Sequence, residues 1–143
     1  MEWASRVEDL GVGEILLTVI NNEGMGQGYD LDLIHAIASR ATIPVIACGG
    51  AGSKEDFSDA VLKAGADAVS ASSVFHYHYA CPKENKKTMQ FSANRLRMGE
   101  QIDSGNIDFL NEGYGGERAI MVEPCSVKDV KTHMQAEGIS VRL

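Results

Sequence analysis

Two short loops in this sequence have the residue types of an oxyanion-binding site. One is residues 49–53, GGAGS, and the other is Ser72-Ser73, and each follows a predicted strand. Because Gly49 and Gly50 carry no side chains, an oxyanion can approach their backbone, and the helix expected after each loop offers free N–H groups. A tight turn without a ligand explains the glycines equally well, so both interpretations stay open at this point.

A third loop, residues 21–28, is the place for acid–base chemistry. Its only acid is Glu23, which can act as a general acid or base or remain a solvated carboxylate. Asn21 can orient a substrate or take a left-handed turn conformation. The three cysteines and four histidines show no spacing typical of metal ligands, so we expect neither a metal nor a cofactor.

The elements that position these loops alternate along the chain. Apolar runs without polar alternation predict parallel strands buried on both faces, over residues 14–20, 43–48 and 67–71. Apolar residues at helical spacing predict helices over residues 2–10, 31–41 and 54–64, of which the last two would be capped by Asp30 and Ser53. This order predicts an α/β fold with a parallel sheet, in which ligands gather at the carboxyl ends of the strands.

Periodicity is lost between residues 79 and 124, where polar and glycine-rich stretches follow one another. We expect an insertion or lid over 79–124 within a single domain, 1–143. Residues 119–125 have the composition of a small strand of their own. The last helix is predicted to start after Ser126 and to end at Gly138.

Charge and composition exclude several classes of function. The 143 residues carry a net charge of −7 and a pI near 5.0, so we expect neither nucleic acid nor a membrane surface as a partner. No apolar run is long enough for a membrane span, and the first residues have no apolar signal region. We therefore expect a cytoplasmic protein.

Three segments together resemble one known family. They are GVGEILLTVINNEGMGQGYDLDLI (11–34), IPVIACGGAGSKEDF (43–57) and AGADAVSASSVFH (64–76). They are similar to the carboxyl-terminal half of the cyclase subunit of imidazole glycerol phosphate synthase. That family folds as a (β/α)₈ TIM barrel, so the resemblance implies a partial barrel. It would hold roughly the last three βα units, with an inserted segment before the last helix.

The resemblance also implies roles for the loop residues. Gly49 and Gly50 match the family's phosphate-binding glycines, and Ser72 and Ser73 match the neighbouring phosphate loop. Gly24 matches a glycine that lines the same site. Together these residues would bind one phosphate group of a phosphorylated small molecule.

Other matched positions concern catalysis and ammonia. Where the family has DRDG this sequence has NNEG, so Asn21 and Glu23 replace two aspartates. Asp67 matches an aspartate at the amino end of the barrel, near the ammonia entry. The family takes this ammonia from a glutaminase subunit. The first five strands of the family, with their catalytic aspartates, have no counterpart here.

The resemblance therefore implies a half-barrel that is completed by another chain. That chain would be a second copy, giving a homo-oligomer, or a separate complementing half-barrel. The first alternative function is delivery of ammonia for amidation of a nucleotide sugar in surface polysaccharide synthesis, because NNEGM with Met25 resembles divergent relatives in those pathways. The second is a non-catalytic, phosphate-binding oligomeric scaffold.

Overall fold

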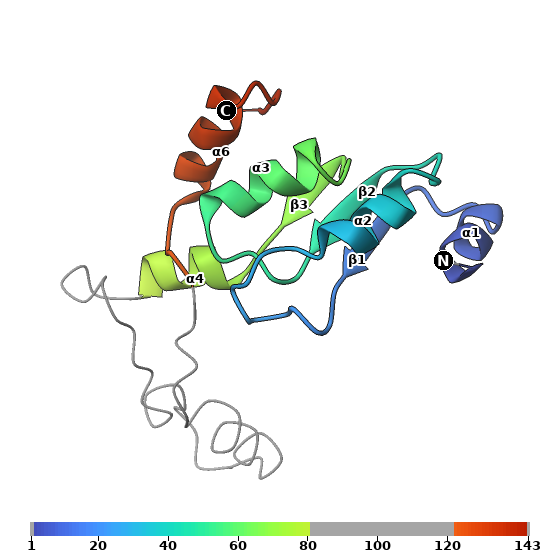
Figure 1. The fold of residues 1–143 in the computed structure, drawn as a ribbon, viewed down its shortest axis with the longest axis horizontal. Coiled ribbons are helices and arrows are strands. Elements are labelled where there is room, and N and C mark those ends of the chain that lie inside the picture. Colours follow the sequence, from blue (N-terminus) through green and yellow to red (C-terminus); the bar gives the residue numbers. More distant parts are fainter. Residues whose placement is uncertain (1, 81–121, 143) are drawn as a thin grey trace, which may run out of the picture. The chain divides into compact units, whose positions relative to one another are not determined.

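The computed structural model describes residues 2–80 and 122–142 (Figure 1). The elements are α1 (Glu2–Asp9), β1 (Ile15–Thr18), α2 (Leu31–Ala38), β2 (Val45–Cys48), α3 (Lys54–Leu62), β3 (Ala68–Ser70), α4 (Ser73–Ala80) and α6 (Val127–Ala136). The three strands form one parallel sheet in the order β1-β2-β3. The α/β class is confirmed, and the sheet is open, as in a part of a barrel.

The helices begin where the sequence places capping residues. Asp30 accepts a hydrogen bond from the amide of Leu33 at 2.9 Å, at the start of α2. Ser126 and Asp129 form a capping box at the start of α6, and Gly138 follows its last turn with a φ of +82°. The helices are confirmed in place, with ends up to three residues shorter than predicted.

The strands are also shorter than the apolar runs that predicted them. Pairing between β1 and β2 covers only Ile15–Thr18 and Val45–Cys48, and pairing with β3 covers Ala68–Ser70. The predicted bounds were wrong at different ends of the strands, because Val19 and Ile20 continue the apolar run after β1 has ended, whereas Ile43 and Pro44 come before the first residue of β2. Val19 still donates one hydrogen bond, to the carbonyl of Cys48 at 3.0 Å.

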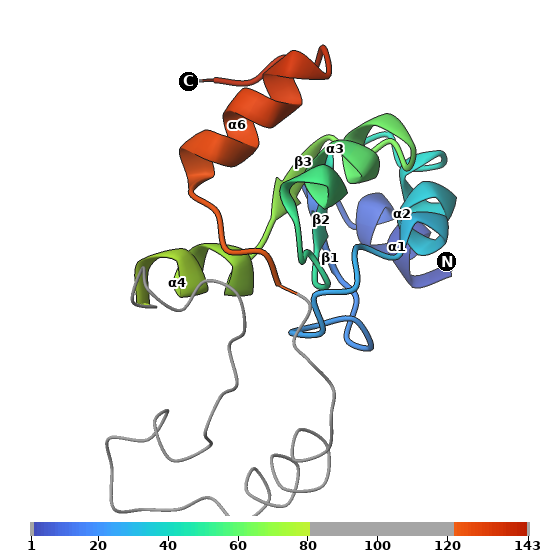
Figure 2. The same cartoon turned by 60° about the vertical axis from the view of Figure 1, so that its left-hand side comes forward.

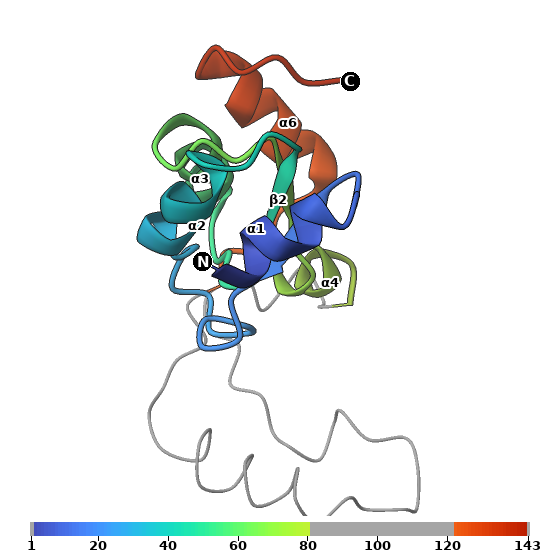
Figure 3. The ribbon, with the colours of Figure 1, turned by 90° about the vertical axis from the view of Figure 1, so that its right-hand side faces the viewer.

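One face of the sheet carries the hydrophobic core. Leu17, Ala47 and Val69 are in register across the three strands, and all three belong to this core. Helices α2 and α3 lie on one side of the sheet (Figure 3). They contribute Ile34 and Phe57, which are 0% and 1% exposed. Burial of these side chains holds the sheet and helices together.

The other face of the sheet is open in the described part of the chain. Leu16, Ile46 and Ala68 are in register there, and Leu16 is 59% exposed. Ile20, just beyond β1, is 84% exposed. Burial of the strands on both faces is thus not reached within the residues that the structure describes, because the helices there cover one face only.

The region predicted as an insertion, residues 79–124, is described only at its two ends. Tyr79, at its expected start, belongs to helix α4. The predicted strand 119–125 is wrong in its described part, since residues 122–125 form none. The amide of Glu123 bonds to the carbonyl of Gly52 at 2.6 Å, but Pro124 has no N–H to extend a ladder. Residues 81–121 of the expected insertion lie outside the described residues.

Most of the apolar stripe predicted for residues 2–10 is exposed, and only Val7 of it is half-buried. Trp3 and Leu10 are 67% and 74% exposed, although they have the spacing of a buried stripe. Helix α1 is held instead by Glu8, whose carboxylate accepts hydrogen bonds from the amide and the hydroxyl of Thr42. Among the described helices, none is long and apolar enough to span a membrane.

Candidate functional site

The three candidate loops leave the sheet at the same edge. Thr18, Cys48 and Ser70 are paired in register at the carboxyl ends of β1, β2 and β3. The loops that follow lie together below the sheet in Figure 2. The amide of Gly28 donates to the carbonyl of Gly50 at 2.8 Å, which joins the first loop to the second. The predicted gathering of the loops at one edge is thus observed.

The glycine loop after β2 is buried beneath the loop after β1. Gly49 and Gly50 have φ values of +91° and +110°, a region that L side chains rarely adopt. A Cβ atom on Gly50 would collide with the carbonyl oxygen of Gly28. Glycine is therefore required at Gly50 by close packing of the two loops, independently of any ligand.

The amino end of α3 is already occupied by a carboxylate from its own chain. Asp56 Oδ2 accepts hydrogen bonds from the amides of Gly52 and Ser53, each at 2.8 Å. The Asp56 carboxylate thus lies at the positive end of the helix, where an external anion would otherwise bind. The amides of Lys54 and Glu55 have no acceptor within the helix, but an oxyanion that approached them would meet the negative charge of this carboxylate.

The amino end of α4 is arranged differently. Its first helical bond runs from the amide of His76 to the carbonyl of Ser72 at 2.8 Å. The amides of Ser73, Val74 and Phe75 therefore have no acceptor within the helix. In the described part of the chain no carboxylate caps them, and Ser72 is exposed while Ser73 is half-buried. This helix end is the better place for an anion.

Glu23 lies against the glycine loop. The Glu23 Oε2 atom is 2.9 Å from the position of a Cβ atom built on Gly49. Asn21 is exposed. Gly24, with a φ of +73°, is half-buried in the turn that carries Glu23. The structure thus brings a carboxylate next to the glycine loop.

Two residues of this edge were missed in the sequence analysis. Tyr29 is 6% exposed, and its hydroxyl donates to the carbonyl of Ser70 at 2.8 Å. Burial is the main cause that raises the pKa of Tyr29 far above its ordinary value, so the hydroxyl stays protonated. The other residue is Asp56. Asp56 could have been found from the sequence, because an acid three residues after Ser53 has the spacing of a capping box. No local sequence signal predicts that Tyr29 bonds to Ser70.

Asp67 lies at the opposite edge of the sheet, as predicted. Its Oδ2 accepts a hydrogen bond from the amide of Val45 at 2.9 Å, and its amide donates to the carbonyl of Val45 at 3.0 Å. The carboxylate therefore fixes the start of β2 to the start of β3. An additional role at an ammonia entry stays a prediction.

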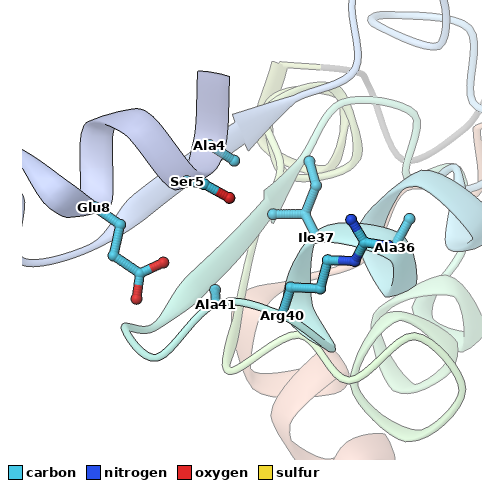
Figure 4. A pocket seen from close by; sticks show the side chains of 7 residues that line it. All are labelled: Ala4, Ser5, Glu8, Ala36, Ile37, Arg40 and Ala41. Atoms are coloured by element: carbon cyan, nitrogen blue, oxygen red, sulfur yellow. The ribbon is translucent and has the colours of Figure 1, made fainter. Parts of the chain in front are cut away.

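Other features offer no second site. Among the described residues, no group of three or more His, Cys, Asp and Glu side chains lies close enough to hold a metal ion. A cavity between α1 and α2, lined by Glu8, Ile37 and Arg40 among others, has a volume of about 10 Å³ (Figure 4). It is far from the loop edge and has room for about one water molecule.

Comparison with known proteins agrees with these features. A family model described as "Histidine biosynthesis protein" matches residues 1–80. Imidazole glycerol phosphate synthase subunit HisF of Dehalococcoides mccartyi is 48% identical over 98 residues, which are 68% of this chain and 39% of that protein. The HisF subunit of Leptospira biflexa is 39% identical over 98 residues, 68% of this chain and 38% of that protein. The HisF subunit of Alkaliphilus metalliredigens is 51% identical over 78 residues, which are 54% of this chain and 31% of that protein. The chain spans about two fifths or less of the length of these curated relatives.

Proposed function

Since the chain belongs to the histidine biosynthesis protein family, we propose that it supplies the phosphate-binding part of a cyclase barrel. The barrel would use ammonia to form imidazole glycerol phosphate in histidine biosynthesis. The relatives described above are named as subunits of the synthase of this compound. Support comes from the parallel βα order and from the glycine and serine loops at one sheet edge.

The observation that carries the proposal is the difference between the two helix ends. The Asp56 carboxylate lies at the start of α3, where it accepts hydrogen bonds from the amides of Gly52 and Ser53, whereas no carboxylate caps the start of α4 in the described part of the chain. A phosphate group of the substrate would bind the amides at Ser72 and Ser73. Gly50, together with Gly24 and Gly49, would form the adjacent wall of the site.

The remaining site residues complete the proposal. Glu23 would serve as general acid or base, and Asn21 would orient the substrate, both from the loop after β1. Asp67 would lie near the entry of ammonia, which a glutaminase subunit would supply. The distance of 2.9 Å between Glu23 Oε2 and a Cβ position built on Gly49 supports the proposed role of Glu23.

The open face of the sheet is the reason to propose a complementing chain segment. Three strands of an eight-stranded barrel are about 38% of it, close to the 39% of the relative that the chain spans. The five remaining units would cover Leu16 and Ile20, which are exposed here. A second copy would bring the total to six strands, so a complementary half-barrel fits better than a homodimer.

The phosphate site can be tested at the first residue of α4. Proline is tolerated at that helix position, and Ser73→Pro removes the amide hydrogen without breaking the helix. Ser73→Ala removes the hydroxyl and keeps the amide. We expect Ser73→Pro to weaken inorganic phosphate binding by tenfold or more, the value of about one charge-assisted hydrogen bond. Ser73→Ala should weaken phosphate binding less than Ser73→Pro does.

Isothermal titration calorimetry of the full chain with inorganic phosphate measures the phosphate affinity of both variants. Ribose phosphate and a nucleotide sugar, titrated in parallel, separate the proposed function from the nucleotide-sugar alternative. Equal phosphate affinity in wild type and Ser73→Pro would place the anion elsewhere and refute the proposed site.

A further inference from the structure

The segment Gly28-Tyr29-Asp30 is bonded to three parts of the chain around the proposed phosphate site. Gly28 donates its amide to the carbonyl of Gly50 at 2.8 Å, and its carbonyl accepts from Asn22 Nδ2 at 3.1 Å. Asp30 caps α2 through the amide of Leu33. Each of the three residues is thus fixed to a different part of the chain.

Tyr29 makes the longest of these connections. It follows the loop after β1, and its hydroxyl donates to the carbonyl of Ser70, 41 residues further along the chain, at 2.8 Å. Ser70 is the last residue of β3, two residues before Ser72. The hydroxyl therefore sets where the backbone of β3 turns into the serine loop.

The aromatic ring of Tyr29 is held separately from its hydroxyl. It packs edge-on against Phe57 of α3 with ring centroids 6.0 Å apart, and it is 6% exposed. The ring would keep its place in the core if the hydroxyl were removed. The two functions of the side chain, packing and hydrogen bonding, can consequently be separated by experiment.

We propose that Tyr29 is a positioning residue for the phosphate site. Through Gly28 it is tied to the glycine loop, and through its hydroxyl it is tied to the end of β3. It thereby sets the separation between Gly50 and the amides of Ser73 that a single phosphate group must span. This inference rests on the proposed phosphate site and deepens it.

The test is Tyr29→Phe in the full chain, with inorganic phosphate as the probe. We expect at least fivefold weaker phosphate binding, because Ser70 loses its donor and the amides after it are no longer held at one distance from Gly50. Two controls accompany it. Tyr79→Phe removes the hydroxyl of a tyrosine that is 74% exposed, and Ile34→Val shortens a fully buried side chain of α2.

Ile34→Val separates positioning from general destabilisation. Both Ile34→Val and Tyr29→Phe should lower the midpoint of urea unfolding, but only Tyr29→Phe should lower phosphate affinity. If Tyr29→Phe binds phosphate as wild type does, the positioning role is refuted while the site stands. A loss of affinity that is matched in Ile34→Val would show an effect of stability alone and also refute it. Absence of phosphate binding in wild type would refute the site itself, and the positioning role with it.

Discussion

At the scale of single residues, the glycine loop is shaped by the packing of two loops. Gly50 combines a φ of +110° with the nearby carbonyl oxygen of Gly28, so any side chain meets both backbone strain and a collision. Gly138 also has a positive φ, of +82°, but open space around it. Substitutions at these two glycines therefore separate the free-energy cost of backbone strain from the free-energy cost of steric contact.

We expect Gly50→Ala to lower the free energy of unfolding by about 2–4 kcal/mol, because strain and overpacking add. Gly138→Ala should cost about 1–2 kcal/mol from strain alone. Urea unfolding followed by circular dichroism measures both. Equal losses in the two variants would show that contact with Gly28 contributes nothing.

Glu23 places a negative charge beside the proposed anion site. Removing it with Glu23→Gln should strengthen phosphate binding by up to about fivefold, the scale of an exposed charge interaction. Glu14→Gln makes the same change in charge at the opposite edge of the sheet and should have no effect. The difference should disappear in 1 M salt, where the Debye length is about 3 Å. Titration with phosphate at low and high salt checks this, and weaker binding by Glu23→Gln would contradict it.

At the scale of elements, helix ends decide which loops can bind an anion. Asp56 at α3 and Asp129 at α6 each accept backbone hydrogen bonds from their own helix start. The hydrogen bonds from Ser126 hold the pKa of Asp129 below its ordinary value of 3.8. α4 has no such carboxylate in the described part of the chain.

The lowered pKa of Asp129 makes the stability of α6 depend on pH. A carboxylate with a lowered pKa contributes stability above its ordinary value of 3.8, and this is lost as the pH falls through the lower, folded-state pKa. We expect Ser126→Ala to unfold at lower urea than wild type at pH 6. The difference between the urea midpoints of wild type and Ser126→Ala should become smaller below pH 4. A difference that is unchanged between pH 6 and pH 3 would contradict this assignment.

Local sequence signals predicted the type and order of the described helices and strands, and three of their caps. Asp30, Ser53 and Ser126 were predicted as caps because their signals lie within a few residues of the helix they begin. The bond from Tyr29 to Ser70 was not predictable, since it joins residues 41 positions apart. The exposure of Leu16 was not predictable either, because an apolar strand residue does not reveal what covers it.

At the scale of the whole molecule, the two faces of the sheet differ in what covers them. Leu17 belongs to the core under α2 and α3, whereas its neighbour Leu16 is 59% exposed. A parallel sheet normally has both faces covered. The open face is therefore the surface that we assign to the remaining units of a barrel.

Leu16→Gln should change the free energy of unfolding of the chain by less than about 0.5 kcal/mol, as exposed substitutions do. Leu17→Gln should cost about 1–3 kcal/mol, because it buries an amide without a partner. Mixing with the first five βα units of the Dehalococcoides relative, followed by light scattering, tests assembly. Wild type should form a 1:1 complex and Leu16→Gln should not. Equal assembly by both would exclude this face.

The most direct test of the account is a phosphate titration of the ¹⁵N-labelled chain followed by amide NMR shifts. We expect saturable shifts that are largest for Ser73, Val74 and Gly50. The amides of Gly52 and Ser53, which Asp56 holds, should move little. Saturable shifts centred on Gly52 and Ser53, or no saturable shift at the loop edge, would contradict the central claim that the anion binds at the start of α4.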